Sequence, residues 1–61
     1  MTTLYTIANR VYGEYLKRGK GIHSPSEALW QLEQYIESNP DVTEPDVIVE
    51  NVVNLLLETD Y

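Results

Sequence analysis

Apolar residues recur every three or four positions along most of the chain, which is the spacing of amphipathic helices rather than of strands. The first such stretch covers about residues 3–18, the second about 25–38 and the third about 44–59. Short polar segments containing Gly, Pro and Asn separate them. The pattern predicts an all-α fold, with residues 1–61 forming one compact three-helix domain.

The stretch from Thr3 to Arg18 has an apolar side and a charged side when it is drawn as a helix. The apolar side consists of Leu4, Ile7, Ala8, Val11 and Tyr15. On the charged side, Glu14 has the helical spacing to pair with Arg10, Lys17 or Arg18. Gly19–Lys20–Gly21 then predicts the end of this helix.

The other two helices have start signals in the sequence. Ser24–Pro25–Ser26–Glu27 is a capping box with Ser at the N-cap and Pro at the first helical position. Thr43–Glu44–Pro45–Asp46 resembles a second box, with Thr43 as its predicted N-cap. In that register Val42 and Val47 occupy the positions of a hydrophobic staple across the helix start.

The third predicted helix is unusually apolar around its circumference. Its apolar residues, from Ile48 to Leu57, cover an arc of about 200° on a helical wheel. One neighbouring helix is too narrow to cover such an arc. Either both other helices pack on it, or a second subunit covers part of it. The β-branched run Val47–Val49 leaves a strand as the alternative to a helix here.

Size and composition favour self-association. A core of 61 residues rarely supplies more than roughly 3–5 kcal/mol, and the chain has no Cys for disulfides. A homodimer would enlarge that core. The N-terminal residues lack the pattern of a signal peptide, and no apolar run is long enough to span a membrane. We therefore expect a soluble cytoplasmic protein without membrane contact.

Charge is divided unevenly along the chain. Residues 1–23 contain all four basic residues and one acid, a formal charge of +3, whereas residues 24–61 contain nine acids and no Lys or Arg, a formal charge of −9. The basic residues are Arg10, Lys17, Arg18 and Lys20. Such asymmetry indicates either internal pairing between the two halves or an electrostatic partner.

The sequence gives little support for catalysis. His23 is the only imidazole, and its neighbour Ser24 already has a role as a helix N-cap. The acidic segment Asn39–Asp46 has two prolines and no Gly, which is unlike a calcium loop. Arg18–Gly19–Lys20–Gly21 lacks the spacing of a phosphate-binding loop. We expect no enzymatic activity, no metal and no cofactor.

The leading functional hypothesis is a protein-interaction domain that binds and modulates or inhibits a basic protein. Trp30 falls among acids on the polar side of the second helix, and Trp is enriched in binding hot spots. Carboxylates arranged on a helix can occupy a basic groove as a nucleic-acid mimic, so the expected partner is a DNA- or RNA-binding protein or enzyme. This description fits accessory proteins of phages and mobile elements. The expected partner-binding residues are Trp30, Glu27, Glu33, Glu37 and Glu50.

Two alternatives remain open at this point. In the first, the chain is a self-associating assembly module, and its acids only provide solubility. The residues expected in its interface are Tyr5, Tyr12, Ile48, Val52, Leu55 and Leu56. In the second, Arg10, Lys17, Arg18 and Lys20 make the chain a DNA-binding regulator. Direct nucleic-acid binding is disfavoured because the last two helices contain no Lys or Arg.

Overall fold

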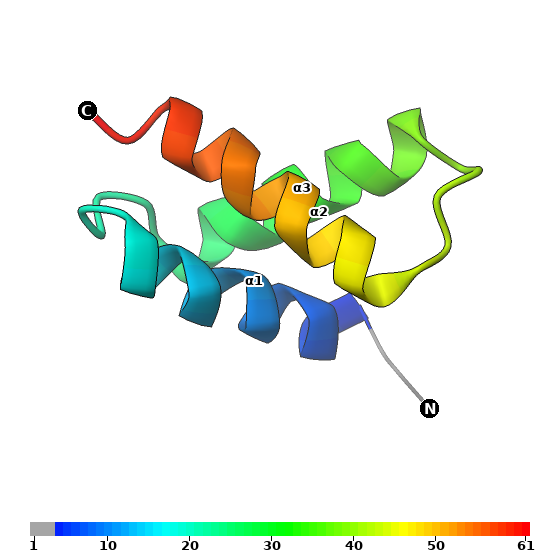
Figure 1. Cartoon of the computed structure of the whole chain (residues 1–61), viewed down its shortest axis with the longest axis horizontal. Helices are drawn as coiled ribbons and strands as arrows, with labels where there is room; N and C mark the ends of the chain where they lie inside the picture. Colours follow the sequence, from blue (N-terminus) through cyan, green and yellow to red (C-terminus); the bar gives the residue numbers. More distant parts are fainter. Residues whose placement is uncertain (1–3) are drawn as a thin grey trace.

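The computed structural model describes residues 4–61 and contains three α-helices joined by short connections. They are α1 (Leu4–Arg18), α2 (Pro25–Ser38) and α3 (Pro45–Glu58). In Figure 1, α1 and α3 run in the same direction, and α2 runs the opposite way and crosses behind α3. The predicted all-α, three-helix fold is confirmed. The predicted first residue of the first helix, Thr3, lies outside the described residues.

The predicted N-cap of α2 is confirmed, but the capping box is only half formed, because within residues 4–61 the Glu27 carboxylate accepts no hydrogen bond from the Ser24 amide. Ser24 has an extended backbone, and its Oγ accepts a hydrogen bond from the Glu27 amide at 3.2 Å. Pro25 occupies the first helical position, where its missing N–H removes no helical hydrogen bond. At the other end, the Asn39 backbone N–H donates to the Tyr35 carbonyl at 2.9 Å, and the helix ends there because Pro40 has no N–H to continue it.

The predicted start of α3 is wrong by one residue. The N-cap is Glu44 rather than Thr43, and it makes no side-chain capping hydrogen bond. Pro45 follows as the first helical residue, and a Pro restricts the residue before it to extended backbone. This restriction places Glu44, not Thr43, immediately outside the helix.

The predicted hydrophobic staple depended on that register and is therefore also wrong. With Glu44 as the N-cap, the fourth helical residue is Ile48 rather than Val47. Ile48 is buried in the core, whereas Val47 is 45% exposed. Val42 still packs against the core from the α2–α3 connection.

The core lies between the three helices, and α3 supplies half of it. Ten residues are buried among those described: Ala8, Val11, Tyr15, Ala28, Leu32, Ile48, Val49, Val52, Val53 and Leu56. Five of these lie on α3, which contacts both α1 and α2. The two other helices thus cover the wide apolar arc of α3 within one chain, and the arc no longer indicates a second subunit. The Val47–Val49 segment is helical, so the strand alternative is excluded.

The connection between α1 and α2 requires a very close approach at Gly19. A Cβ atom at this position would lie 2.5 Å from Asp60 Oδ2 and 2.7 Å from Cε1 of the fully buried Tyr15. Gly21, two residues later, has φ of +76°, a conformation that side chains rarely adopt. Glycine at these two positions lets the chain turn tightly against the C-terminal end of α3.

We predict that Gly19→Ala lowers the free energy of unfolding by about 1–3 kcal/mol, because its methyl group would displace the Tyr15 ring or the Asp60 carboxylate. Urea denaturation followed by circular dichroism measures this change. Gly13→Ala is the matched control, since nothing lies within 4 Å of a Cβ built there, inside α1. The control should stabilise the protein by about 0.5–1 kcal/mol. Equal effects of the two substitutions would contradict the close approach at Gly19.

Candidate binding surface

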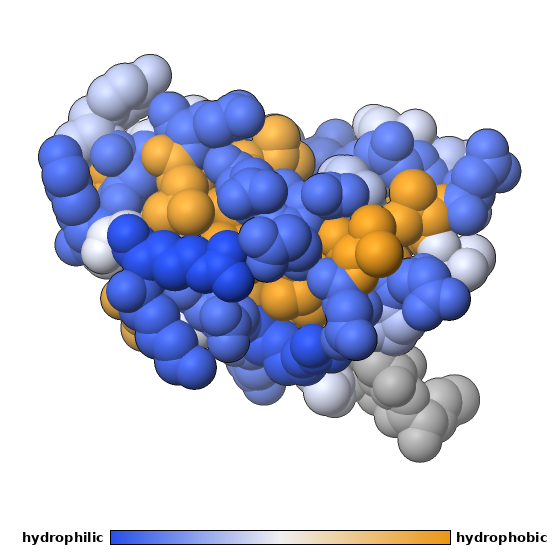
Figure 2. Space-filling model, viewed as in Figure 1, coloured by the Kyte–Doolittle hydropathy of each residue, from blue (hydrophilic) through white to orange (hydrophobic). Residues whose placement is uncertain are grey.

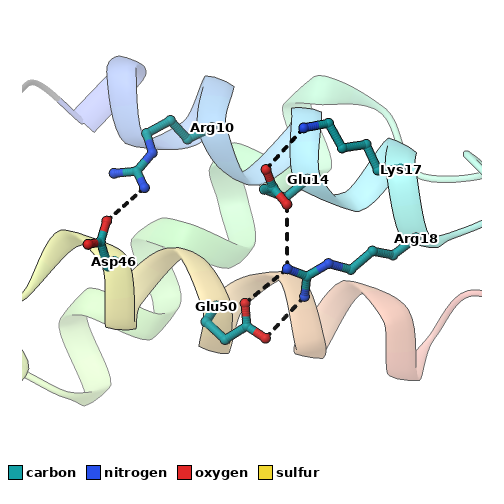
Figure 3. Close-up of polar contacts among 6 residues, drawn as sticks. All are labelled: Arg10, Glu14, Lys17, Arg18, Asp46 and Glu50. Carbon is teal, nitrogen blue, oxygen red and sulfur yellow. Dashed lines mark hydrogen bonds and ion pairs between the residues drawn. The ribbon is translucent and has the colours of Figure 1, made fainter.

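Charged residues of α1 and α3 form ion pairs across one face of the molecule (Figure 3). Arg18 makes two parallel contacts with Glu50, Nη1 to Oε1 at 3.0 Å and Nη2 to Oε2 at 3.1 Å. Arg10 Nη2 donates to Asp46 Oδ1 at 2.8 Å. The parallel course of α1 and α3 brings Arg10 beside the start of α3 and Arg18 beside its middle.

Glu14 extends this arrangement within α1. Its Oε1 lies 3.4 Å from Lys17 Nζ and its Oε2 lies 3.4 Å from Arg18 Nη2. The hydrogen bond and charge of Glu50 raise the pKa of the Arg18 guanidinium, and Arg18 in turn lowers the pKa of the Glu50 carboxyl. Exposed ion pairs of this kind contribute little to stability, typically under about 1 kcal/mol each. Their main consequence is electrical, because they neutralise the α1–α3 face.

The predicted partner-binding residue Glu50 therefore lies apart from the others, with its carboxylate bound to Arg18. The four basic residues are also mostly engaged. Arg10, Lys17 and Arg18 each pair with a carboxylate, whereas Lys20 makes no salt bridge within residues 4–61. Figure 2 shows this side of the molecule, where hydrophilic side chains separate small hydrophobic areas. A DNA-binding regulator that uses these cations would have to break their ion pairs first.

The remaining negative charge lies mainly on α2 and the connection to α3. Within residues 4–61, six side-chain carboxylates form no ion pair and accept no hydrogen bond: Glu27, Glu33, Glu37, Asp41, Glu44 and Glu58. The first three lie on the side of α2 opposite its buried residues Ala28 and Leu32. We call Glu27, Trp30, Glu33 and Glu37 the α2 acidic face. In Figure 1, α2 crosses behind α3, whereas the ion pairs join α1 to α3.

Trp30 is exposed at the centre of the α2 acidic face. Its side chain is 53% accessible to solvent. Glu27 precedes it by three residues and Glu33 follows it by three, so both lie next to it on the helix surface. The structure thus brings together four of the five predicted partner-binding residues and separates Glu50 from them.

The residues expected to mediate self-association are divided between the core and the surface. Ile48, Val52 and Leu56 are buried within the chain's own core, and Tyr12 packs against it. Leu55 is half-buried, and Tyr5 is 68% exposed. A dimer built on the buried α3 residues would have to open the three-helix core.

A polar cluster that the sequence did not suggest joins the α1–α2 connection to the C-terminal end of the chain. The hydroxyl of the buried Tyr15 donates to Asp60 Oδ1 at 2.8 Å and accepts the His23 amide at 3.1 Å. Asp60 Oδ2 accepts the Lys20 amide, and His23 Nε2 lies 2.9 Å from Thr59 Oγ1. No local spacing in the sequence predicts this cluster, because Asp60 is 45 residues from Tyr15 in the chain.

The hydrogen bonds of this cluster hold the α1–α2 connection against the C-terminal end of the chain. Its central hydroxyl is fully enclosed and already has both a donor and an acceptor among its partners. His23 contacts Thr59 rather than Ser24, whose Oγ caps α2. Partial desolvation alone would raise the pKa of Asp60, but hydrogen bonds from Lys20 and Tyr15 and the nearby charges of His23 and Lys20 lower it.

The described part of the chain contains no group of three or more His, Asp or Glu side chains arranged to hold a metal ion. Within residues 4–61 no helix is both long and apolar enough to cross a bilayer. Comparisons with protein-family models, with curated proteins and with solved structures found no match to this chain. The function of this chain is therefore inferred from its own surface.

We predict that the stability of the protein falls as the pH drops below about 4, the usual range of carboxyl titration. The folded state lowers the pKa of Asp60 and Glu50, so it favours their charged forms. Stability from these groups is present above their unfolded pKa and is lost as pH falls through the folded pKa. Thermal unfolding between pH 7 and 2.5 measures this. Asp60→Asn should flatten the acid-side decline, and a decline as steep as in the native chain would contradict the assignment to Asp60.

Proposed function

We propose that the protein is a small helical interaction domain whose α2 acidic face binds a basic protein, and that it modulates or inhibits that partner. The observation that carries this proposal is the separation of charge. The cations Arg10, Lys17 and Arg18 are paired on the α1–α3 side, whereas the carboxylates of the α2 acidic face have no cation of their own. The negative charge of the α2 acidic face is therefore available to a positively charged partner.

The nature of the partner follows from that field. Unpaired carboxylates speed encounter with a positively charged surface and make binding sensitive to salt. Glu33 and Glu37 lie about 6 Å apart along the axis of α2, at 1.5 Å per residue. A rigid helix with carboxylates one turn apart presents a regular row of negative charge. Such a row suits the groove of a DNA- or RNA-binding protein, where the domain would act as a nucleic-acid mimic.

Trp30 adds an apolar contact to the electrostatic attraction. An exposed indole buries a large apolar area when a partner covers it, and such residues dominate binding energy at interface centres. Its ring can also lie against an Arg side chain of a basic partner. The surrounding carboxylates would then form a polar rim around a central aromatic contact.

Self-association is the alternative function, and the exposed side of α1 is the feature that supports it. Tyr5 is 68% and Leu16 is 47% exposed there. These two residues are separated by three helical turns, and hydrophilic side chains lie between the apolar areas in Figure 2. The α2 acidic face offers a more concentrated combination of charge and apolar area, so we favour binding of a basic partner.

We predict that Glu33→Gln with Glu37→Gln weakens partner binding by roughly two- to thirtyfold, the loss of two exposed charge pairs. The partner is first identified by capture from lysate of the source cells with stepwise salt elution. Affinity for the purified partner is then measured at several salt concentrations. A nucleic acid bound by that partner should compete with the native domain.

The matched control is Asn9→Lys with Gly13→Lys, which adds the same two units of charge to exposed positions of α1. If the control weakens binding as much as the glutamine variant, net charge rather than the α2 acidic face is responsible. Recovery of only this chain itself, by contacts that survive high salt, would replace the proposal with self-association.

We predict that Trp30→Ala weakens binding to the same partner at least about tenfold, the loss expected for a central aromatic contact. The free energy of unfolding should change by no more than about 1 kcal/mol, because the side chain is half in solvent. Tyr5→Ala is the control, since Tyr5 is an exposed aromatic residue on α1, away from the α2 acidic face. An unchanged affinity of the Trp30 variant would remove Trp30 from the interface.

A further inference from the structure

A second surface, distinct from the α2 acidic face, lies between α2 and α3. It is an open groove of about 470 Å³, lined by residues from the middle to the C-terminal end of each helix and by Asn39. Tyr35 and Leu55 supply its half-buried apolar part. No basic residue lines it, because the chain has no Lys or Arg after Lys20.

Carboxamides dominate the polar lining of this groove. They belong to Gln31, Gln34, Asn39, Asn51 and Asn54. Two of them hold the groove in shape through their nitrogen atoms. Asn51 Nδ2 donates to the Tyr35 hydroxyl at 2.7 Å, and Asn39 Nδ2 donates to the Tyr35 carbonyl at 2.9 Å.

These two hydrogen bonds leave carboxamide oxygens free in the groove. The Oδ1 atoms of Asn39 and Asn51 accept no hydrogen bond within residues 4–61, and each Nδ2 uses one of its two N–H groups. The side chains of Gln31, Gln34 and Asn54 are also without a partner in the described chain. Glu58 adds a carboxylate that forms no ion pair. Because Glu58 is the charged residue of the lining and no basic residue offsets it there, the occupant that fits best is a donor that carries positive charge.

The C-terminal ends of α2 and α3 also favour a positively charged occupant. The C-terminal end of a helix carries a partial negative charge, which basic side chains of the last turn normally offset. Lys17 and Arg18 do so in α1, but the last turns of α2 and α3 contain no basic residue. The groove reaches the last residue of each of these helices, Ser38 and Glu58.

We propose that the α2–α3 groove binds an arginine side chain of the basic partner. The guanidinium presents five N–H donors in a planar fork, which suits a carboxylate flanked by carboxamide oxygens better than the compact ammonium of lysine. Glu58 would balance the charge, and Gln31 and Asn54 would accept the remaining donors. The methylene stem and the flat face of the guanidinium would lie on Leu55 and Tyr35. This inference rests on the proposed function for the source of the arginine, but its test uses a defined peptide.

The probe is the blocked tripeptide Gly-Arg-Gly, titrated into the ¹⁵N-labelled full chain and followed by NMR. Blocked Gly-Lys-Gly and Gly-citrulline-Gly are the comparison peptides, and citrulline is the neutral analogue of arginine with nearly the same shape. We expect the arginine peptide to shift the side-chain amide signals of Gln31 and Asn54 and to bind more tightly than the other two. Equal binding of the lysine peptide, or shifts confined to the α2 acidic face, would overturn the proposal.

Two variants test whether the Glu58 carboxylate and the Asn54 carboxamide contact the arginine peptide. Glu58→Gln should weaken binding of the arginine peptide about two- to fivefold, as expected for one exposed ion pair. Glu33→Gln, the matched control, removes the same unit of charge from an exposed residue outside the groove and should have less effect. Asn54→Ala, with unchanged charge, should weaken binding roughly two- to tenfold.

Equal effects of Glu58→Gln and Glu33→Gln would mean that only the overall negative field attracts the peptide, and the groove would be rejected. That result would leave the proposed function intact, because partner binding through the α2 acidic face is measured separately with the Glu33 and Glu37 variants. Conversely, if those variants bind the partner normally while the peptide still occupies the groove, the α2 acidic face fails and the groove stands.

Discussion

The wide apolar surface of α3 is the constraint on which the rest of the structure depends. A 14-residue helix with five buried residues cannot be covered by one neighbour, so α1 and α2 must both pack on it. Burial of apolar surface is the main favourable term in folding. A chain of this size buries only a small amount of apolar surface when it folds. The placement of α1 and α2 against α3 therefore fixes which polar residues meet and which stay exposed.

That placement separates the paired charges of α1 and α3 from the unpaired carboxylates of α2. With α1 parallel to α3, the basic side of α1 lies along the acidic side of α3, and Arg10 and Arg18 reach Asp46 and Glu50. The exposed pairs add little to stability, yet they cancel the charge of this face. The outer side of α2 has no such neighbour, so its carboxylates remain unpaired around Trp30. Proposed partner binding on α2 is thus a consequence of how the core is packed.

The ends of the helices are secured in a different way. Gly19 brings the α1–α2 connection against Asp60, and the Tyr15 hydroxyl links that carboxylate to the His23 amide. These hydrogen bonds satisfy a tyrosine hydroxyl inside the core, where an unpaired one would be costly. The α2–α3 groove lies on another side of α3, and its Asn51–Tyr35 hydrogen bond shows how a polar pair can line a groove without filling it.

The sequence by itself determined the helices, their order and the faces they bury. The 3.6-residue period and the Ser24–Pro25 cap were local signals, and both were read correctly. The start of α3 was misread because Pro45 restricts Glu44 more strongly than the Thr43 hydroxyl favours a cap. The clustering of Trp30 with three acids was also predictable, because one helix carries them all.

Only the tertiary structure decided what happens between helices. It paired Glu50 with Arg18 and turned Ile48, Val52 and Leu56 into the core of a single chain. It also joined Tyr15 to Asp60 and formed the amide-lined groove between α2 and α3. Each of these features joins residues many positions apart. Periodicity along one helix says which side is buried, but the partner of that side depends on how the helices pack together.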